Sequence, residues 1–165
     1  MVLALEPMPD NYECCQRNID RNAVLGNKVM PIMVGAGERS EWASAKRGGS
    51  GQASQWMLDT ALTGDILVLP VDGIVPDSSE VRLIKIDVEG YEDHVLSGLS
   101  QLVPALSFEF TTIAIDVALR CLDILSSRAE YRYDVAMGES QQLVFGRFIP
   151  AYEMADFLKR LPPEA

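Results

Sequence analysis

The sequence lacks the residue patterns that several large classes of protein require. It has one histidine, and its three cysteines include the adjacent pair Cys14 and Cys15, so no CxxC or Cys/His spacing for a zinc site exists. No cluster of basic residues exceeds a pair such as Lys46-Arg47, and the net charge is −10, so no surface typical of nucleic-acid binding is expected. No apolar run approaches the roughly 18 to 20 residues of a membrane-spanning helix. We therefore expect no required metal, no nucleic-acid partner and no membrane partner.

The composition that remains is typical of a soluble globular protein. Hydrophobic residues make up 48% of the 165 residues. A chain of this length can form one domain over residues 1–165 and bury roughly 70% of the surface that the unfolded chain exposes. The first residues include no basic n-region and no small-residue cleavage site, and the odd number of cysteines favours reduced thiols. These features predict a cytoplasmic location.

Apolar runs of strand length alternate with segments of helical periodicity. Residues 2–5 predict a strand that stops at Glu6-Pro7, and Asp10 predicts the N-cap of the helix that follows. Residues 29–35 predict one interior strand, and the Gly/Ser-rich residues 46–54 predict a flexible loop, with phosphate cradling as the weaker alternative. Further elements are expected as strands in 66–72, 81–86 and 105–110, a helix at 113–128, and a closing antiparallel pair at 131–138 and 141–150. The pattern predicts an α/β fold with a mostly parallel sheet.

In such a fold the carboxyl ends of the parallel strands lie along one edge of the sheet, where ligands bind. By that rule Glu6, residues 35–37, residues 87–90 and Glu109 converge on a common rim. A carboxylate such as Glu6 can accept both hydroxyls of a ribose, although a helix-capping or solvated glutamate is an equal alternative. Glu109 either lines a substrate pocket or is a buried structural carboxylate.

The segment IKIDVEGYED concentrates carboxylates at a strand end. Asp87 and Glu89 come first, and carboxylates this close raise one another's pKa, which suits a general base or a cation site. Gly90 can adopt a positive φ or let a ligand approach. Asp87 and Glu89 are therefore candidates for a functional role.

The neighbours of these two carboxylates have simpler explanations. Glu92 and Asp93 favour the positive end of the helix that follows. Lys85 is expected to form a structural ion pair. His94 could act as a base because histidine is the side chain that ordinarily changes charge near neutral pH, but a polar residue on a surface helix is the simpler interpretation.

Two segments resemble the FkbM family of S-adenosylmethionine-dependent methyltransferases. The segment LALEPMPDNYECCQRNI looks like the family's V-x-A-x-E-P-x-P-x-x-Y region. The segment LIKIDVEGYEDHVLSGLSQLVPALSFEF looks like K-x-D-x-E-G-x-E-x-x-V-L-x-G followed by a strand that ends in Glu. The resemblance covers residues 2–110, with both motifs in the family's order.

The resemblance implies a Rossmann-like class I methyltransferase sandwich with S-adenosyl-L-methionine as cofactor. Glu6, with Pro7 beside it, would hold the ribose of the cofactor. Gly35 and Ala36 would lie near its adenine, and Asp87 and Glu89 would lie at its methyl-transfer end.

The activity implied by the resemblance is O-methylation of a hydroxyl on a sugar, glycan or polyketide-type small molecule. Such a transfer needs positioning of the two reactants and a base for the hydroxyl proton. Asp87 or Glu89 would be that base, whereas Glu109 and His94 would contact the substrate.

One part of the family pattern has no counterpart. A strand that ends in a D-x-G-x-N/G-x-G loop should precede the first acidic strand, but the GAG at 35–37 follows Glu6. We therefore expect an N-terminally truncated domain whose sheet lacks its first strand and whose exposed edge a homo-oligomer could cover. A non-catalytic, methyltransferase-like interaction module is the alternative to an enzyme. A flavodoxin-like nucleotide-binding domain is a third reading that leaves both motifs unexplained.

Overall fold

A computed structural model describes residues 1–22, 24–25, 28–47, 56–59, 64–75 and 80–162. The chain divides into two compact units. The first comprises Met1–Asp77 with Ser97–Ser100, and the second comprises Ser78–Leu96 with Gln101–Ala165. No helix in the described part of the chain is both long enough and apolar enough to cross a membrane.

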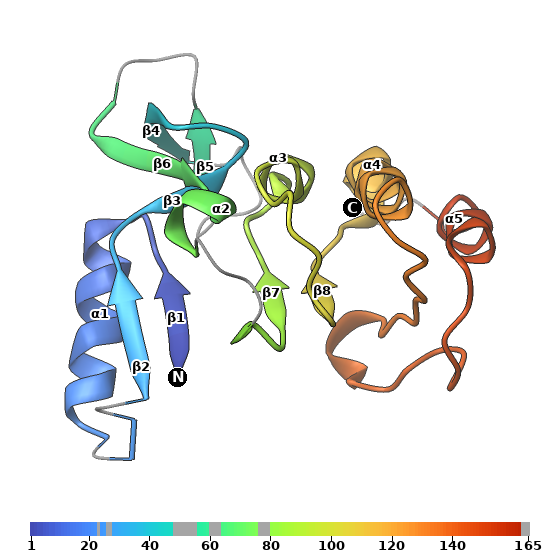
Figure 1. Cartoon of the computed structure of the whole chain (residues 1–165), viewed down its shortest axis with the longest axis horizontal. Helices are drawn as coiled ribbons and strands as arrows, with labels where there is room; N and C mark the ends of the chain where they lie inside the picture. The colour runs from blue at the N-terminus through green and yellow to red at the C-terminus, as the bar shows by residue number, and fades with distance from the viewer. Residues whose placement is uncertain (23, 26–27, 48–55, 60–63, 76–79, 163–165) are drawn as a thin grey trace. The chain divides into compact units, whose positions relative to one another are not determined.

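The first unit begins with the expected strand, helix and strand (Figure 1). Strand β1 (Val2–Leu5) pairs in parallel with β2 (Val29–Ile32), and α1 (Pro9–Asp20) connects them. The helix begins two residues earlier than the sequence predicted. Its N-cap is Met8, with Pro9 in the first turn, so the N-cap expected at Asp10 is wrong. Proline suits this position because the first N–H groups of a helix have no partner within it.

The apolar run 29–35 does not form one interior strand. Strand β2 ends at Ile32, and the backbone N–H of Val34 then donates to the Ile32 carbonyl at 3.0 Å. The chain continues as β3 (Gly35–Gly37), which pairs with a different partner in a second sheet. The expectation was wrong because an apolar run reports burial and carries no information on where a strand changes neighbours.

The second sheet has the strand order β3-β6-β4-β5. Strand β6 (Ile66–Pro70) is parallel to β3 and antiparallel to β4 (Glu41–Arg47), which in turn is antiparallel to β5 (Trp56–Asp59). The short helix α2 (Val71–Ile74) follows β6. Ala43, Ile66 and Val68 form the buried core here. The first two residues of the loop expected at 46–54 belong to β4, and residues 48–54 lie outside the described part of the chain.

The second unit repeats the parallel strand pattern. Strand β7 (Ile84–Ile86) pairs in parallel with β8 (Leu106–Phe108), and α3 (Glu92–Ser97) begins after the acidic turn that follows β7. The helix expected at 113–128 is confirmed as the 3-10 turn η2 (Thr112–Ala114) followed by α4 (Ile115–Ser126). The unit also holds η3 (Gly138–Ser140) and α5 (Ala151–Leu158).

One hydrophobic core cluster of the second unit lies between α4 and α5. Its buried members are Ala118, Leu122, Ile149, Met154 and Leu158. Four of them recur at helical spacing on α4 or α5, so each helix presents one apolar face to this core. The fifth, Ile149, lies on the segment that leads into α5.

The fold class predicted from the sequence needs two corrections. In the described residues the strands form three small sheets instead of one mostly parallel sheet. The expected closing strand pair is present only as two isolated antiparallel bridges, Tyr133 with Ile149 and Ala136 with Leu143. Positive φ angles at Gly138, Gln141 and Gly146 show repeated turns in this segment, which prevent a regular ladder from forming. The α/β class itself is confirmed.

Candidate functional site

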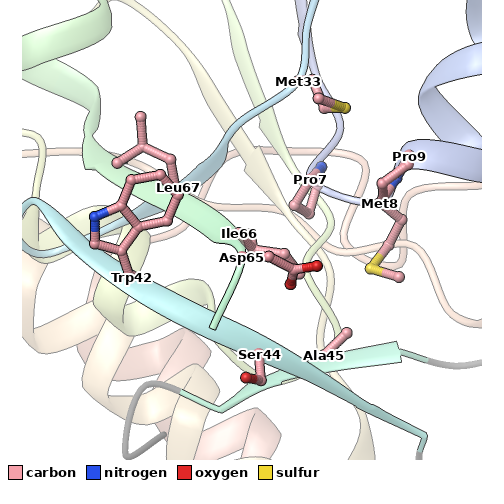
Figure 2. A pocket seen from close by; sticks show the side chains of 10 residues that line it. All are labelled: Pro7, Met8, Pro9, Met33, Trp42, Ser44, Ala45, Asp65, Ile66 and Leu67. Carbon is pink, nitrogen blue, oxygen red and sulfur yellow. The ribbon is translucent and has the colours of Figure 1, made fainter. Parts of the chain in front are cut away.

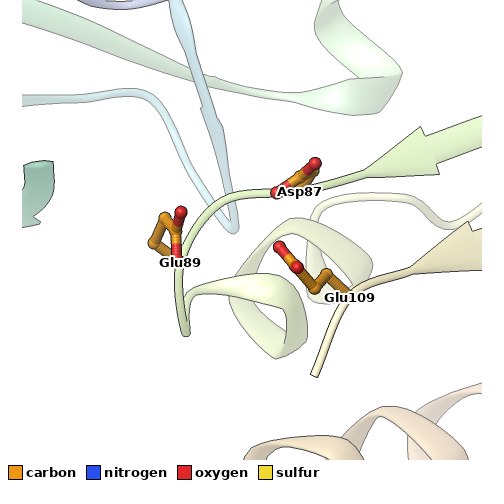
Figure 3. Close-up of side chains that lie close together, drawn as sticks. All are labelled: Asp87, Glu89 and Glu109. Carbon is orange, nitrogen blue, oxygen red and sulfur yellow. The ribbon is translucent and has the colours of Figure 1, made fainter. Parts of the chain in front are cut away.

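Three of the predicted site residues meet at the carboxyl ends of β7 and β8. Asp87 follows β7, Glu89 lies on the next turn, and Glu109 follows β8. Each offers a carboxylate oxygen, and these oxygens all lie within 4.8 Å of one another. Figure 3 shows the Glu109 side chain directed back toward the other two. Because β7 and β8 are parallel neighbours, their ends necessarily meet, and this part of the predicted rim is confirmed.

One proton is shared within this acidic cluster of Asp87, Glu89 and Glu109. The hydrogen bond from Glu109 and the ion pair with Lys85 hold the pKa of Asp87 below its ordinary value. The hydrogen bond to Asp87, followed by desolvation and the charges of Asp87 and Glu89, raises the pKa of Glu109 to about 7. Near neutrality Asp87 is thus an anion, and Glu109 is half protonated. The ion pair predicted for Lys85 is confirmed.

This shared proton makes the free energy of unfolding depend on pH. Glu109 has a pKa of about 7 in the folded protein and an ordinary value of 4.5 otherwise, so between these values the folded state binds more protons. Its contribution to stability is present below the lower value and is lost as the pH rises through about 7. Between about pH 5 and about pH 8, urea unfolding should therefore show a larger loss of stability for the wild type than for Glu109→Gln. Equal pH dependence in the two proteins would contradict the shared proton.

Glu92 and Asp93, in the first turn of α3, are buried side chains and not exposed charges. Only 2% of Glu92 and 7% of Asp93 are exposed. Glu92 accepts hydrogen bonds from the backbone of the preceding turn, and the Asp93 carboxylate is 2.6 Å from Nε of Arg120. Arg120 also binds Asp116. The simple interpretation from the helix dipole is therefore incomplete, because both side chains are buried among specific partners.

His94 is exposed on α3 and is not part of the acidic cluster. Its ring stacks on Tyr91, with the ring centroids 4.2 Å apart and the planes inclined by 15°. Stacking of this kind orients the imidazole at the surface. The role in substrate binding expected of His94 stays a prediction.

Glu6 lies at the carboxyl end of β1 and contacts the start of α1. Its Oε1 accepts a hydrogen bond from the backbone N–H of Met8 at 2.8 Å and one from Nδ2 of Asn11 at 3.4 Å. The helix-capping reading of Glu6 is therefore confirmed. Both bonds use the same oxygen, so Oε2 takes part in neither. The ribose-binding role stays a prediction that this geometry permits.

A cavity of about 440 Å³ begins at Pro7, directly after Glu6. Figure 2 shows Trp42 and Leu67 on one side of it, Pro7 and Met33 on the other, and Asp65 between them. The full lining comprises Pro7, Met8, Pro9, Met33, Trp42, Ser44, Ala45, Asp65, Ile66 and Leu67. The volume lies in the range of small-molecule sites, which combine apolar walls with a few polar groups.

Sequence reasoning missed Trp42 and Asp65 in this cavity. Trp42 is 57% exposed although its strand neighbour Ala43 is fully buried, and Asp65 is exposed just before β6. The alternation of β4 could have indicated that Trp42 faces away from the core, but nothing in the linear pattern places it beside Pro7. Gly35 and Ala36 are buried in β3 and do not line the cavity.

Comparison with known proteins relates Glu6 with its neighbouring cavity, and also the acidic cluster, to one family. The model of the methyltransferase FkbM domain matches residues 1–133, which include Glu6 and the whole acidic cluster. The hexuronic acid methyltransferase AglP of Haloferax volcanii is 26% identical over 150 residues, which is 88% of this chain and 61% of that protein. The chain thus spans about three fifths of the length of this relative. No solved structure matches.

Proposed function

The chain belongs to the FkbM methyltransferase family, and from that membership we propose that it takes part in methyl transfer from S-adenosyl-L-methionine to a hydroxyl group of a sugar or glycan. The observation that carries the proposal is the family match over residues 1–133, which spans the acidic cluster. The sugar-type acceptor rests on the name of the distant relative, a hexuronic acid methyltransferase.

The acidic cluster supplies what such a transfer needs from the protein. The cofactor, when bound, supplies an electrophilic methyl group on a sulfonium. As the hydroxyl oxygen forms its bond to that carbon and the carbon–sulfur bond breaks, the hydroxyl proton must pass to a base. We assign this base to Asp87 or Glu89, because the proton held by Glu109 keeps Asp87 ionised near neutrality.

The residues at the end of β1 fit the nucleoside part of the cofactor. Glu6 keeps Oε2 outside its capping bonds, and a carboxylate oxygen can accept from ribose hydroxyls. The adjacent cavity offers the exposed Trp42 indole as a stacking surface for a purine, and Asp65 as an acceptor for an exocyclic amino group. Pro7 joins the two. The part expected of Gly35 and Ala36 beside the adenine stays a prediction.

Binding of S-adenosylhomocysteine tests this assignment without any need for an acceptor. Trp42→Ala should raise the dissociation constant of S-adenosylhomocysteine about fivefold, because one stacked aromatic pair contributes about 1 kcal/mol. Glu6→Gln should raise the dissociation constant about tenfold or more, because the ribose loses a charged acceptor. The amide oxygen of the glutamine can still accept the hydrogen bond at the start of α1. Isothermal titration calorimetry measures both.

The matched control is Tyr152→Ala, which removes an aromatic side chain that is 69% exposed in the second unit. It should leave the dissociation constant unchanged. A wild-type protein that unfolds cooperatively yet shows no binding would overturn the enzyme reading and favour the non-catalytic module. Binding that neither substitution affects would overturn the assignment to Glu6 and Trp42.

A further inference from the structure

The turn between β7 and α3 holds its backbone in an unusual conformation. Glu89 has a φ of +55° and Gly90 has a φ of +91°. Glycine adopts such angles freely, but a residue with a side chain pays about 1 to 2 kcal/mol to do so. Glu89 therefore needs interactions from its surroundings to stay in this conformation.

Glu92 provides those interactions from the first turn of α3. Its Oε1 accepts a hydrogen bond from the backbone N–H of Val88 at 3.3 Å and another from that of Gly90 at 3.1 Å. The two donors are the residues on either side of Glu89. Glu92 is only 2% exposed, so water cannot readily replace it as the acceptor for these N–H groups.

We propose that Glu92 is a positioning residue that fixes the turn on both sides of Glu89 and thereby holds the Glu89 carboxylate beside Asp87 and Glu109. This inference rests on the proposed methyl transfer, in which Asp87 or Glu89 takes the hydroxyl proton, and it further commits Glu89 to a part in that step. Without Glu92, the Glu89 backbone relaxes toward the ordinary right-handed region, and its carboxylate leaves the cluster.

A double-mutant cycle with Glu89 separates positioning from general stabilisation. Glu92→Ala should lower kcat about 100-fold, the size expected for misplacing a reacting group by about 1 Å. Glu92→Gln should recover most of kcat, since the amide oxygen can accept from the same two N–H groups. In a Glu89→Gln background, Glu92→Ala should lower kcat less than about twofold further, because residues that act as a unit are not additive.

A structural readout tests the same inference without any activity. A residue with positive φ has a short distance between its own amide and α protons, so Glu89 should give a strong intraresidue NOE in the wild type. Glu92→Gln should keep this NOE, and Glu92→Ala should lose it. The control Glu130→Ala, at an exposed glutamate of the same unit, should change neither the NOE nor kcat.

Each other outcome has a definite meaning. Equal effects of Glu92→Ala in both backgrounds, or an unchanged kcat in Glu89→Gln, would overturn the inference and leave the proposed function intact. A wild type that binds no S-adenosylhomocysteine would overturn the proposed function, and the NOE would still decide whether Glu92 holds the turn.

If Glu92→Ala does not fold, Gly90→Ala replaces it in the cycle. A Cβ added at Gly90 meets no atom within 4 Å, so this substitution strains the turn without overpacking it. Its loss of kcat should likewise nearly vanish in the Glu89→Gln background, and an undiminished loss would overturn the inference.

Discussion

Gly98→Ala should lower the free energy of unfolding by about 3 kcal/mol or more, the upper range for an overpacked site. An added Cβ would lie 1.9 Å from the carbonyl oxygen of Gly37 and 3.1 Å from Cα of Pro70. Both are backbone atoms, of β3 and of the last residue of β6, so neither can move aside without disturbing the pairing of these two strands. The substitution therefore has no inexpensive way to relax.

Thermal or urea unfolding of the purified protein measures this effect, and the chain offers a matched control. A Cβ at Gly73, in α2 of the same unit, would meet its nearest atom, Cγ of Pro70, at an ordinary 3.5 Å. Gly73→Ala should therefore leave stability unchanged or raise it by about 0.5 to 1 kcal/mol, as glycine to alanine does within helices. A Gly98→Ala protein as stable as the Gly73→Ala protein would contradict the close packing of this segment.

The motif E-G-x-E-x-x-V-L-x-G shows how much of this site a sequence can predict. Its first glutamate and Asp87 were expected at a strand end, and the neighbouring strand end at Glu109 follows from parallel pairing. Its two glycines have different reasons to be glycine. Gly90 has a positive φ, whereas Gly98 lies against the backbone of β3 and β6. The first reason could be predicted from local turn chemistry. The second depends on Gly37, which lies 61 positions earlier in the sequence, and on Pro70, which lies 28 positions earlier.

What the sequence could not predict depends on long-range packing. The break between β2 and β3 occurs within a uniformly apolar run, so periodicity gave no sign of a change in strand partner. The cavity beside Pro7 combines residues from α1, β4 and β6, and its aromatic wall at Trp42 belongs to no recognised motif. The shared proton likewise requires the distance between Asp87 and Glu109, which sequence spacing alone does not give.

Asp87→Asn should reduce kcat for methyl transfer by about 10² to 10⁴, the contribution typical of a general base. Asparagine keeps the shape and an oxygen that can accept from Glu109, but it cannot take a proton from a hydroxyl. The same change replaces the charged acceptor of the Glu109 hydrogen bond by a neutral one and removes the negative charge of Asp87, so the pKa of Glu109 should fall from about 7 toward its ordinary value of 4.5. Transfer of labelled methyl to hexuronic acids and neutral hexoses measures the first effect, and carbon-13 NMR titration of the carboxylates measures the second.

These two measurements, together with S-adenosylhomocysteine binding, distinguish a base from a residue whose charge only affects its neighbours. If Asp87 is the base, Asp87→Asn lowers kcat far more than it weakens S-adenosylhomocysteine binding. If Glu89 is the base, the Glu109 pKa still falls in Asp87→Asn, but Glu89→Gln causes the larger loss of kcat. The control Asp116→Asn alters an exposed carboxylate paired with Arg120, outside the acidic cluster, and should change neither quantity. Since Asp87 and Glu89 are the two carboxylates assigned to this step, near-wild-type kcat in both variants would remove the cluster from the chemistry and leave it a structural feature of the β7 and β8 ends.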